Sequence, residues 1–196
     1  MNRSDLASER KHQIIKATIE CITRYGYSSF SMQDVARVAD VSKGIIHYYF
    51  LNKEDLMMAV LDNVSSEIET LLTSSDTGQD PKVRLSNVIW MCANIVLNKR
   101  EYYRINMDFW TQIDQKQKVR EEIARHYSQF RGAIANIIQQ GINQGCFRKG
   151  DAHQYASLIM ALMDGIALQW LFDEGVFIYD EIVKNCEETI MAFLKV

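Results

Sequence analysis

The pattern of apolar positions along the chain predicts helices almost throughout. Between residues 8 and 26, apolar side chains recur every three or four positions, and Gly26 marks the end of that run. A single proline and nine glycines among 196 residues also favour long uninterrupted helices. The expected fold class is therefore all-α. Further helices are predicted at 53–72, 82–98, 100–113, 117–144, 151–173 and 178–194.

A stretch that follows the first predicted helix contains two short helices separated by a tight turn. Ser31 can cap the first of them and Ser42 the second, because their hydroxyls can accept from free backbone N–H groups. Asp40 falls where the backbone must turn, in a left-handed conformation that aspartate tolerates. Lys43 and Gly44 leave the tip of the second helix small and basic, so that it can approach another surface closely. This arrangement is typical of a DNA-binding helix-turn-helix.

These residues also carry a family resemblance. The segment DVARVADVSKGIIHYYFLNKEDLM resembles the DNA-binding signature of the TetR family of bacterial transcriptional repressors. Three positions depart from the family pattern: Asp40 replaces the usual glycine, His47 the usual tyrosine, and Ile45 a small residue or threonine. The shared residues are Val35-Ala36, Val41-Ser42-Lys43-Gly44, Tyr49-Phe50 and Lys53-Glu54-Asp55-Leu56.

Within that family, the chain is similar to the choline-responsive BetI-like branch. The resemblance implies a homodimer with an N-terminal three-helix helix-turn-helix domain, residues 1–53, and a C-terminal helical bundle for ligand binding and dimerisation, residues 54–196. The similarity lies in Ile45-Ile46 before Tyr49-Phe50, and in Tyr103, Phe109-Trp110, Arg120, Tyr127, Arg131, Gly141, Gly145-Cys146-Phe147 and Asp164-Gly165.

Charge is distributed unevenly along the chain, although the net charge of −3 does not suggest a nucleic-acid partner. Residues 1–53 carry eight Lys/Arg and five Asp/Glu, whereas residues 54–196 carry 14 and 20. A basic N-terminal part on an acidic body suits a protein that contacts phosphate at one end. The polar N-terminus, the scattered cysteines and the lack of a long apolar stretch favour a reduced cytoplasmic protein without a membrane partner.

The candidate DNA-reading residues lie on the two short helices and just beyond them. Lys43 can reach guanine O6 and N7, Ile45 can contact a thymine methyl group, and Gln33 can bond adenine or a phosphate. The alternatives are a solvated Lys53, a partly buried His47, and core positions for Tyr48 and Phe50. The expected contacts are Ser31, Gln33, Ser42, Lys43, Gly44, Ile45, His47, Tyr49 and Lys53.

Aromatic residues and two acids in the C-terminal part suggest a ligand site. Asp108 and Asp164 interrupt apolar runs, and a buried acid needs a partner such as an arginine or a bound cation. Aromatics beside a carboxylate suit an amphipathic effector, preferably a cationic one. The alternative is a plain aromatic core in which Arg104 pairs with Asp108. The candidate residues are Trp90, Tyr103, Asp108, Phe109, Trp110, Tyr127 and Asp164.

The helix predicted at 151–173 is apolar on nearly every side, so it needs cover on two faces. Together with 178–194 it is expected to form a four-helix interface in a homodimer. No catalytic motif or metal cluster is found; Glu9-x-x-His12 lacks the second copy that a di-iron site needs, so neither enzyme activity nor a cofactor is expected. The alternatives are a helical binding or interaction protein that does not bind DNA, and a transcriptional activator.

Overall fold

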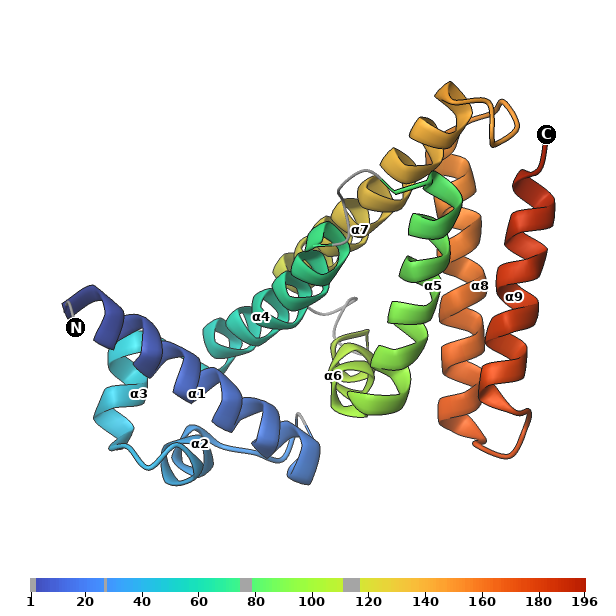
Figure 1. Ribbon diagram of the computed structural model, residues 1–196. Coiled ribbons are helices and arrows are strands. Elements are labelled where there is room, and N and C mark those ends of the chain that lie inside the picture. The colour runs from blue at the N-terminus through green and yellow to red at the C-terminus, as the bar shows by residue number, and fades with distance from the viewer. Residues whose placement is uncertain (1–2, 27, 75–78, 111–116) are drawn as a thin grey trace. The chain divides into compact units, whose positions relative to one another are not determined.

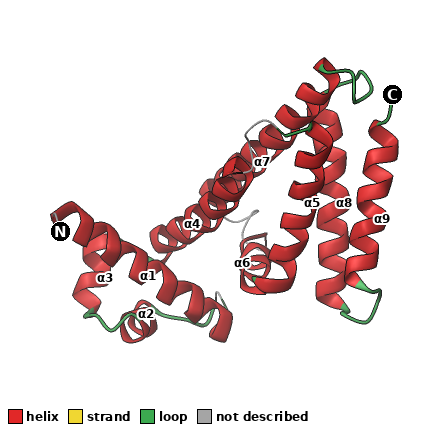
Figure 2. Cartoon of the chain, in the orientation of Figure 1, coloured by secondary structure: helices red, strands yellow, loops and turns green. Residues whose placement is uncertain are grey.

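Helix α1 (Arg3–Tyr25) crosses two short helices, α2 (Met32–Val38) and α3 (Lys43–Tyr49), in the computed structural model (Figure 1). The structure describes residues 3–26, 28–74, 79–110 and 117–196. Every element in these ranges is a helix, which confirms the all-α class (Figure 2). The chain continues with α4 (Lys53–Ser74), α5 (Pro81–Asn98), α6 (Arg100–Trp110), α7 (Gln117–Asn143), α8 (Ala152–Phe172) and α9 (Tyr179–Leu194).

Helix α1 begins five residues before the start that apolar periodicity predicts. Its first buried apolar side chain is Ile14, and the side chains from Glu9 to Gln13 are exposed. This first part contains no glycine or proline, so the backbone stays helical without a buried face. Gly26 has a φ of 75°, the left-handed conformation expected of a glycine that ends a helix.

The described chain forms two compact units. Unit 1 comprises Met1–Glu67 and Arg100–Ile123, and its core joins α1, α2, α3 and the first half of α4 to α6. Ile14, Ile46 and Phe50 are almost completely buried there, so the short helices are held by packing and not by their own length. Other buried members are Ile15, Cys21, Ile22, Phe30, Val35, Leu56, Met57, Val60, Leu61, Ile105 and Val119.

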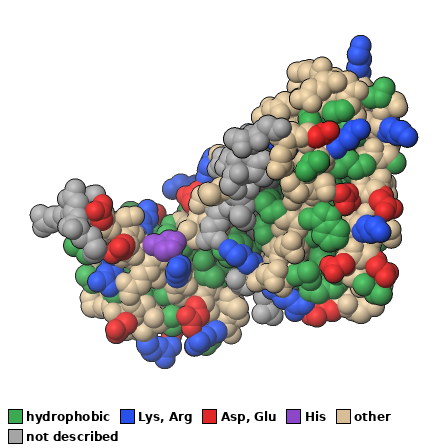
Figure 3. Space-filling model, in the orientation of Figure 1, with side chains coloured by type: hydrophobic (Ala, Val, Ile, Leu, Met, Phe, Trp, Pro, Cys, Tyr) green, Lys and Arg blue, Asp and Glu red, His purple; other side chains and the backbone are tan. Residues whose placement is uncertain are grey.

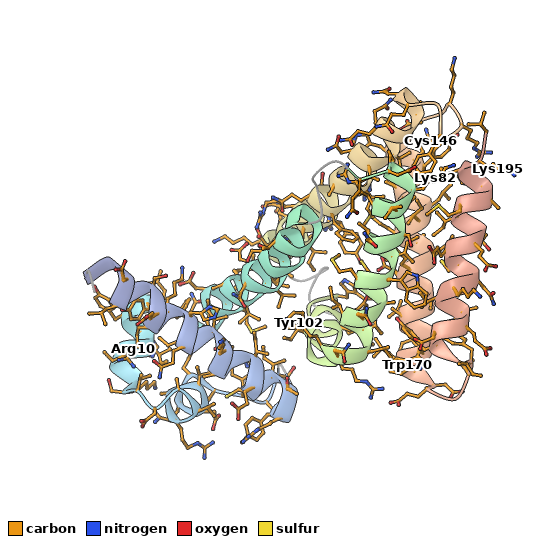
Figure 4. All side chains as sticks on the ribbon, viewed as in Figure 1. Arg10, Lys82, Tyr102, Cys146, Trp170 and Lys195 are labelled. Carbon is orange, nitrogen blue, oxygen red and sulfur yellow. The ribbon has the colours of Figure 1, made fainter. Side chains whose placement is uncertain are left out.

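Unit 2 comprises Ile68–Lys99 and Ala124–Val196, and in it α5, α8 and α9 pack on one another. The rings of Trp170 and Tyr179 lie 4.9 Å apart, which joins the end of α8 to the start of α9. The backbone N–H of Arg148 donates to the carbonyl of Leu194 at 2.8 Å, and this bond ties the loop after α7 to the end of α9. Figure 4 places Lys82, Cys146 and Lys195 at that same end of unit 2.

Helix α8 corrects the expectation that the chain has no long apolar stretch. By length and composition alone it is apolar enough to cross a membrane, as the core helix of a soluble protein also can be. The structure packs α8 on α5 and α9, and the buried residues of α8 include Ile159 and Trp170. Leu158 and Leu162, on another side, are 54% and 45% exposed. On the face that Figure 3 shows, hydrophobic side chains gather over α5, and charged side chains lie over α9.

Candidate nucleic-acid interface and ligand site

Helix α2 begins with a complete capping box. The hydroxyl of Ser31 accepts from the N–H of Asp34, whose carboxylate accepts from the N–H of Ser31 at 2.9 Å. The same hydroxyl donates to Asp34 Oδ2 at 2.6 Å, and Arg37 pairs with Oδ1 at 2.7 Å. The bonds from Ser31 and the charge of Arg37 lower the pKa of Asp34. Ser31 is therefore a helix cap, as predicted, and it remains exposed.

The turn between α2 and α3 has the predicted left-handed residue. Asp40 has a φ of 50°, and the N–H of Val41 reaches back to the carbonyl of Ala36 at 3.0 Å. Gln13 on α1 donates to the carbonyl of Ala39 at 2.7 Å, a contact that sequence reasoning did not anticipate. This bond ties the turn to α1.

Helix α3 presents its first turn to solvent. Ser42 caps it by accepting from the N–H of Ile45 at 3.3 Å, as predicted. Lys43, Gly44 and His47 are exposed, and Ile45 is 38% exposed. Gln33, in the first turn of α2, is exposed as well. Unit 1 therefore leaves the side chains expected to read bases free of its core.

Tyr48, near the end of α3, differs from expectation. Tyr48 was expected in the core, but it is 80% exposed, whereas the neighbouring Phe50 is buried as predicted. Tyr49 is half-buried, and its ring meets that of Tyr48 edge to face at 5.0 Å. Leu51, which precedes α4, is 82% exposed, while Leu56 in the first turn of that helix is buried. The buried positions nearby are already filled by Phe50 and Leu56.

Lys53 is held within unit 1 more closely than a solvated lysine would be. Its Nζ donates to the carbonyl of Phe30 at 2.7 Å and lies 4.0 Å from the centroid of the Phe30 ring. These contacts join the start of α4 to the segment before α2.

In unit 2, the structure brings together two of the residues predicted to bind a ligand. The hydroxyl of Tyr127 on α7 donates to Oδ2 of Asp164 on α8 at 3.2 Å. Asp164 is half-buried, and burial raises its pKa, although the bond from Tyr127 acts in the opposite direction. Burial and the charge of Asp164 raise the pKa of Tyr127 and bring the pKa of the Cys92 thiol to about 12. Cys92 on α5 is thus a neighbour that sequence reasoning missed.

Trp90, another predicted ligand contact, forms a hydrogen bond with a residue of α9. Its Nε1 donates to Oε2 of Glu187 on α9 at 2.7 Å, and Ser86 Oγ donates to Oε1 at 2.5 Å. Glu187 had not been singled out, because a lone glutamate on an amphipathic helix gives no signal in the sequence. Trp90 also lines a groove of about 480 Å³ along α5, and Glu187 lines one of about 510 Å³ between α5 and α9. Neither lining includes Asp164.

The remaining candidates lie on α6, within unit 1. Tyr103 and Trp110 are both half-buried. The side chains of Asp108 and Phe109 lie outside the part of the chain that the structure describes, and so does that of Arg104, the proposed partner of Asp108. A ligand site that combines the α6 residues with Tyr127 and Asp164 therefore remains a prediction.

Comparison with known proteins agrees with both parts of this description. The family model for bacterial regulatory proteins of the tetR family matches residues 14–60, and the model for the C-terminal part of BetI-type transcriptional repressors matches residues 81–195. The first match covers the helix-turn-helix. The second covers the helices that carry Tyr127, Asp164 and Glu187.

Individual relatives are distant. The regulator YhgD of Bacillus subtilis is 22% identical over 84% of this chain and 86% of its own length, and TtgR of Pseudomonas putida is 25% identical over 84% and 81%. A solved regulator from Saccharomonospora viridis, in complex with choline, is 24% identical, with a TM-score of 0.82 over 96% of this chain and 99% of that one. A TetR regulator from Haloarcula marismortui reaches a TM-score of 0.84 at 19% identity, over 95% and 97%. Together with the helix-turn-helix geometry, the two family matches show that the chain belongs to the TetR family of transcriptional regulators and has a C-terminal domain of the BetI type.

Proposed function

We propose that this protein is a cytoplasmic repressor that binds a palindromic operator as a homodimer and releases it when a small amphipathic cation binds. The observation that carries the first part is the exposed tip of α3, where Lys43, Gly44 and His47 lie outside the core while Ile46 is buried. A helix anchored from behind and free at its N-terminal turn can enter the major groove.

The roles within the DNA-reading surface follow from side-chain chemistry. Lys43 meets guanine, Gln33 meets adenine, and Ile45 rests on a thymine methyl group. Ser31, Ser42, Tyr49 and Lys53 contact or orient the backbone, with His47 beside the bases. The exposure of Tyr48 adds a residue to this surface. The functional division is residues 1–53 for DNA and residues 54–196 for ligand binding and dimerisation.

The homodimer forms through α8 and α9. Leu158 and Leu162 are one helical turn apart on α8 and are exposed, and Phe193 on α9 is 37% exposed. Two copies of these helices side by side would cover such faces in a four-helix arrangement. Dimerisation also supplies the two recognition helices that a palindromic operator requires.

The effector binds around Tyr127 and Asp164, with Trp90, Tyr103, Asp108, Phe109 and Trp110 as further candidate contacts. A half-buried carboxylate whose bonded partner is neutral is poised to accept a cation. The structural relative from Saccharomonospora viridis was solved with choline, a cation of this chemical class. This choice of effector rests on the chemistry of Asp164 and on that relative.

Induction requires a ligand that prefers one arrangement of the two DNA-binding domains. The two DNA-binding domains must lie about 34–36 Å apart to reach successive major grooves, so a modest displacement of one domain lowers the affinity for the operator. Helix α4 runs from the end of the DNA-binding domain into the ligand-binding domain, and it is the element proposed to transmit the change.

The test is selection of bound fragments from random duplex DNA, followed by affinity measurements across salt concentrations. A palindromic site with a steep dependence on salt is expected. Lys43→Ala and Gln33→Ala should each relax the preference for one base, by about 1–3 kcal/mol for a bidentate contact. Failure to select any sequence would contradict the proposal. Choline should then release the selected duplex, and binding of anions alone would contradict the cationic effector.

A further inference from the structure

A groove of about 510 Å³ lies in unit 2 where the start of α5, the loop after α7 and the end of α9 meet. Its volume falls within the range of roughly 300–1,000 Å³ that is usual for sites of small molecules. Phe147 forms part of its lining and is only 2% exposed, and the hydrogen bond from the N–H of Arg148 to the carbonyl of Leu194 ties the loop to α9. The described lining contains neither Tyr127 nor Asp164, so this groove is separate from the proposed effector site.

Two lysines give one end of this groove a positive charge. Lys82 lies in the first turn of α5 and Lys195 directly follows α9, and Figure 4 places both at the same end of unit 2 as Cys146. Among the residues that the structure describes, neither ammonium forms a hydrogen bond or an ion pair. Both side chains are exposed, and an ammonium is a compact charge that binds carboxylate or phosphate groups. The two lysines can therefore bind an anion that enters the groove.

The one acid in the described lining already has hydrogen-bond donors. Glu187 accepts from the hydroxyl of Ser86 at 2.5 Å through one oxygen, and from the indole N–H of Trp90 at 2.7 Å through the other. Ser86 lies about one helical turn beyond Lys82 along α5. Glu187 lies about two turns before Lys195 along α9. The carboxylate therefore lies at the other end of the groove from the lysines.

Apolar side chains line the groove between its two charged ends. Val83 on α5 is 48% exposed, Phe147 lines the groove from the loop, and Met191 contributes from α9. Methionine is unbranched and flexible, so its side chain adapts to ligands of different shapes. A hydrocarbon chain that packs on these three residues would leave water, which favours binding.

We propose that this groove binds an amphipathic anion, with a carboxylate or phosphate headgroup on a short hydrocarbon chain. The headgroup lies at Lys82 and Lys195, and the chain lies on Val83, Phe147 and Met191. The charge of this ligand is opposite to that of the proposed cationic effector, so the protein has two sites with different chemistry. This proposal depends neither on DNA binding nor on the effector, because the residues that it uses lie outside both of those sites.

The probe is sodium octanoate, and Cys146 reports on the groove because it lines it. Cys21 and Cys186 are buried, and burial brings the pKa of the Cys92 thiol to about 12, so iodoacetamide should alkylate Cys146 first. Octanoate should slow this alkylation, as measured by mass spectrometry of the peptide. Octanol and octylamine lack a negative charge and should protect about tenfold less well. Octyl phosphate is compared with octanoate, because the anion that protects at the lower concentration carries the preferred headgroup.

Lys82→Ala and Lys195→Ala should each weaken octanoate binding roughly tenfold in calorimetry, because each variant loses one charged donor. The matched control is Lys184→Ala, which removes an exposed lysine of α9 outside the described lining and should bind octanoate as the wild type does. Asp164→Asn should also bind octanoate normally, which separates this groove from the proposed effector site.

Equal protection of Cys146 by octanol and octanoate would overturn the proposal, because the lysines would then play no part. Equal affinity of the three lysine variants for octanoate would overturn it for the same reason. Octanoate that binds without slowing the alkylation of Cys146 occupies another site, and the proposal is then wrong. If neither anion binds, the groove is not a ligand site.

Discussion

The hydroxyl of Tyr127 donates a hydrogen bond to the carboxylate of Asp164 at 3.2 Å, and it joins α7 to α8 inside unit 2. This bond gives a half-buried acid a neutral partner. The acid therefore keeps a raised pKa, which an arginine or lysine in the place of Tyr127 would have lowered. A bound cation would lower it in the same way, so ligand binding and protonation of Asp164 are coupled.

Asp164→Asn should stabilise the ligand-free protein at neutral pH. Because burial raises the pKa of Asp164, ionisation of this carboxyl destabilises the folded state. The full destabilisation is present at pH values above the raised pKa. Below about pH 4, the carboxyl is protonated in both folded and unfolded chains and the cost disappears. Urea unfolding across pH should show a gain that fades as the pH falls. Asp173→Asn, which removes a charge from an exposed residue, is the control, and identical profiles would refute the prediction.

Binding of choline should strengthen as the pH rises through the pKa of Asp164, because the cation favours the ionised carboxylate. Binding should release protons, which calorimetry in buffers of different ionisation enthalpy can detect. In Asp164→Asn, affinity should fall about tenfold or more and lose its pH dependence. Equal proton release by the variant and the wild type would show that another group is titrating.

Lys53→Ala should reduce the stability of unit 1 in addition to weakening DNA binding. The substitution removes the donor to the Phe30 carbonyl and the cation over the Phe30 ring, at a cost of about 1 kcal/mol. Lys16→Ala, which removes an exposed lysine from α1, is the stability control. If thermal unfolding shows no difference between the two variants, the contacts with Phe30 contribute nothing measurable.

Gly141→Ala and Gly132→Ala should have opposite effects although both residues lie on α7. A methyl group at position 141 would overlap the ring of Phe147, so the variant should lose about 1–3 kcal/mol. Position 132 has no neighbouring atom within 4 Å, and alanine there should gain about 0.5–1 kcal/mol. Chemical denaturation measures both, and destabilisation of similar size in the two variants would contradict the packing of Phe147.

Leu162→Glu should yield folded monomers that lose operator affinity. Its side chain is 45% exposed on α8, so a charge there is compatible with the fold of one chain but not with a buried dimer face. Ile190→Glu would be a poor test, because Ile190 is buried within the chain and a charge should unfold it. Sedimentation velocity and circular dichroism separate the two effects. A dimer that persists in Leu162→Glu would exclude this face.

Features that depend on neighbouring residues could be predicted from the sequence. The caps at Ser31 and Ser42, the start of α5 at Asp80-Pro81 and the left-handed Asp40 involve residues a few positions apart. Helical periodicity likewise located most helix bounds, although it missed the first turns of α1, where no buried face exists. The exposed Lys43 and Gly44 followed from the same local pattern.

Contacts between distant residues were decided only by the tertiary structure. The indole N–H of Trp90, a predicted ligand contact, donates to Glu187, 97 positions away, and Lys53 donates to the carbonyl of Phe30, 23 positions away. Tyr48 was assigned a core position but is exposed, whereas Phe50, two residues later, is buried. Periodicity gives the face of a helix on which a side chain lies, but it does not say which other helix covers that face. The burial of a residue and its partner therefore depend on how the helices pack.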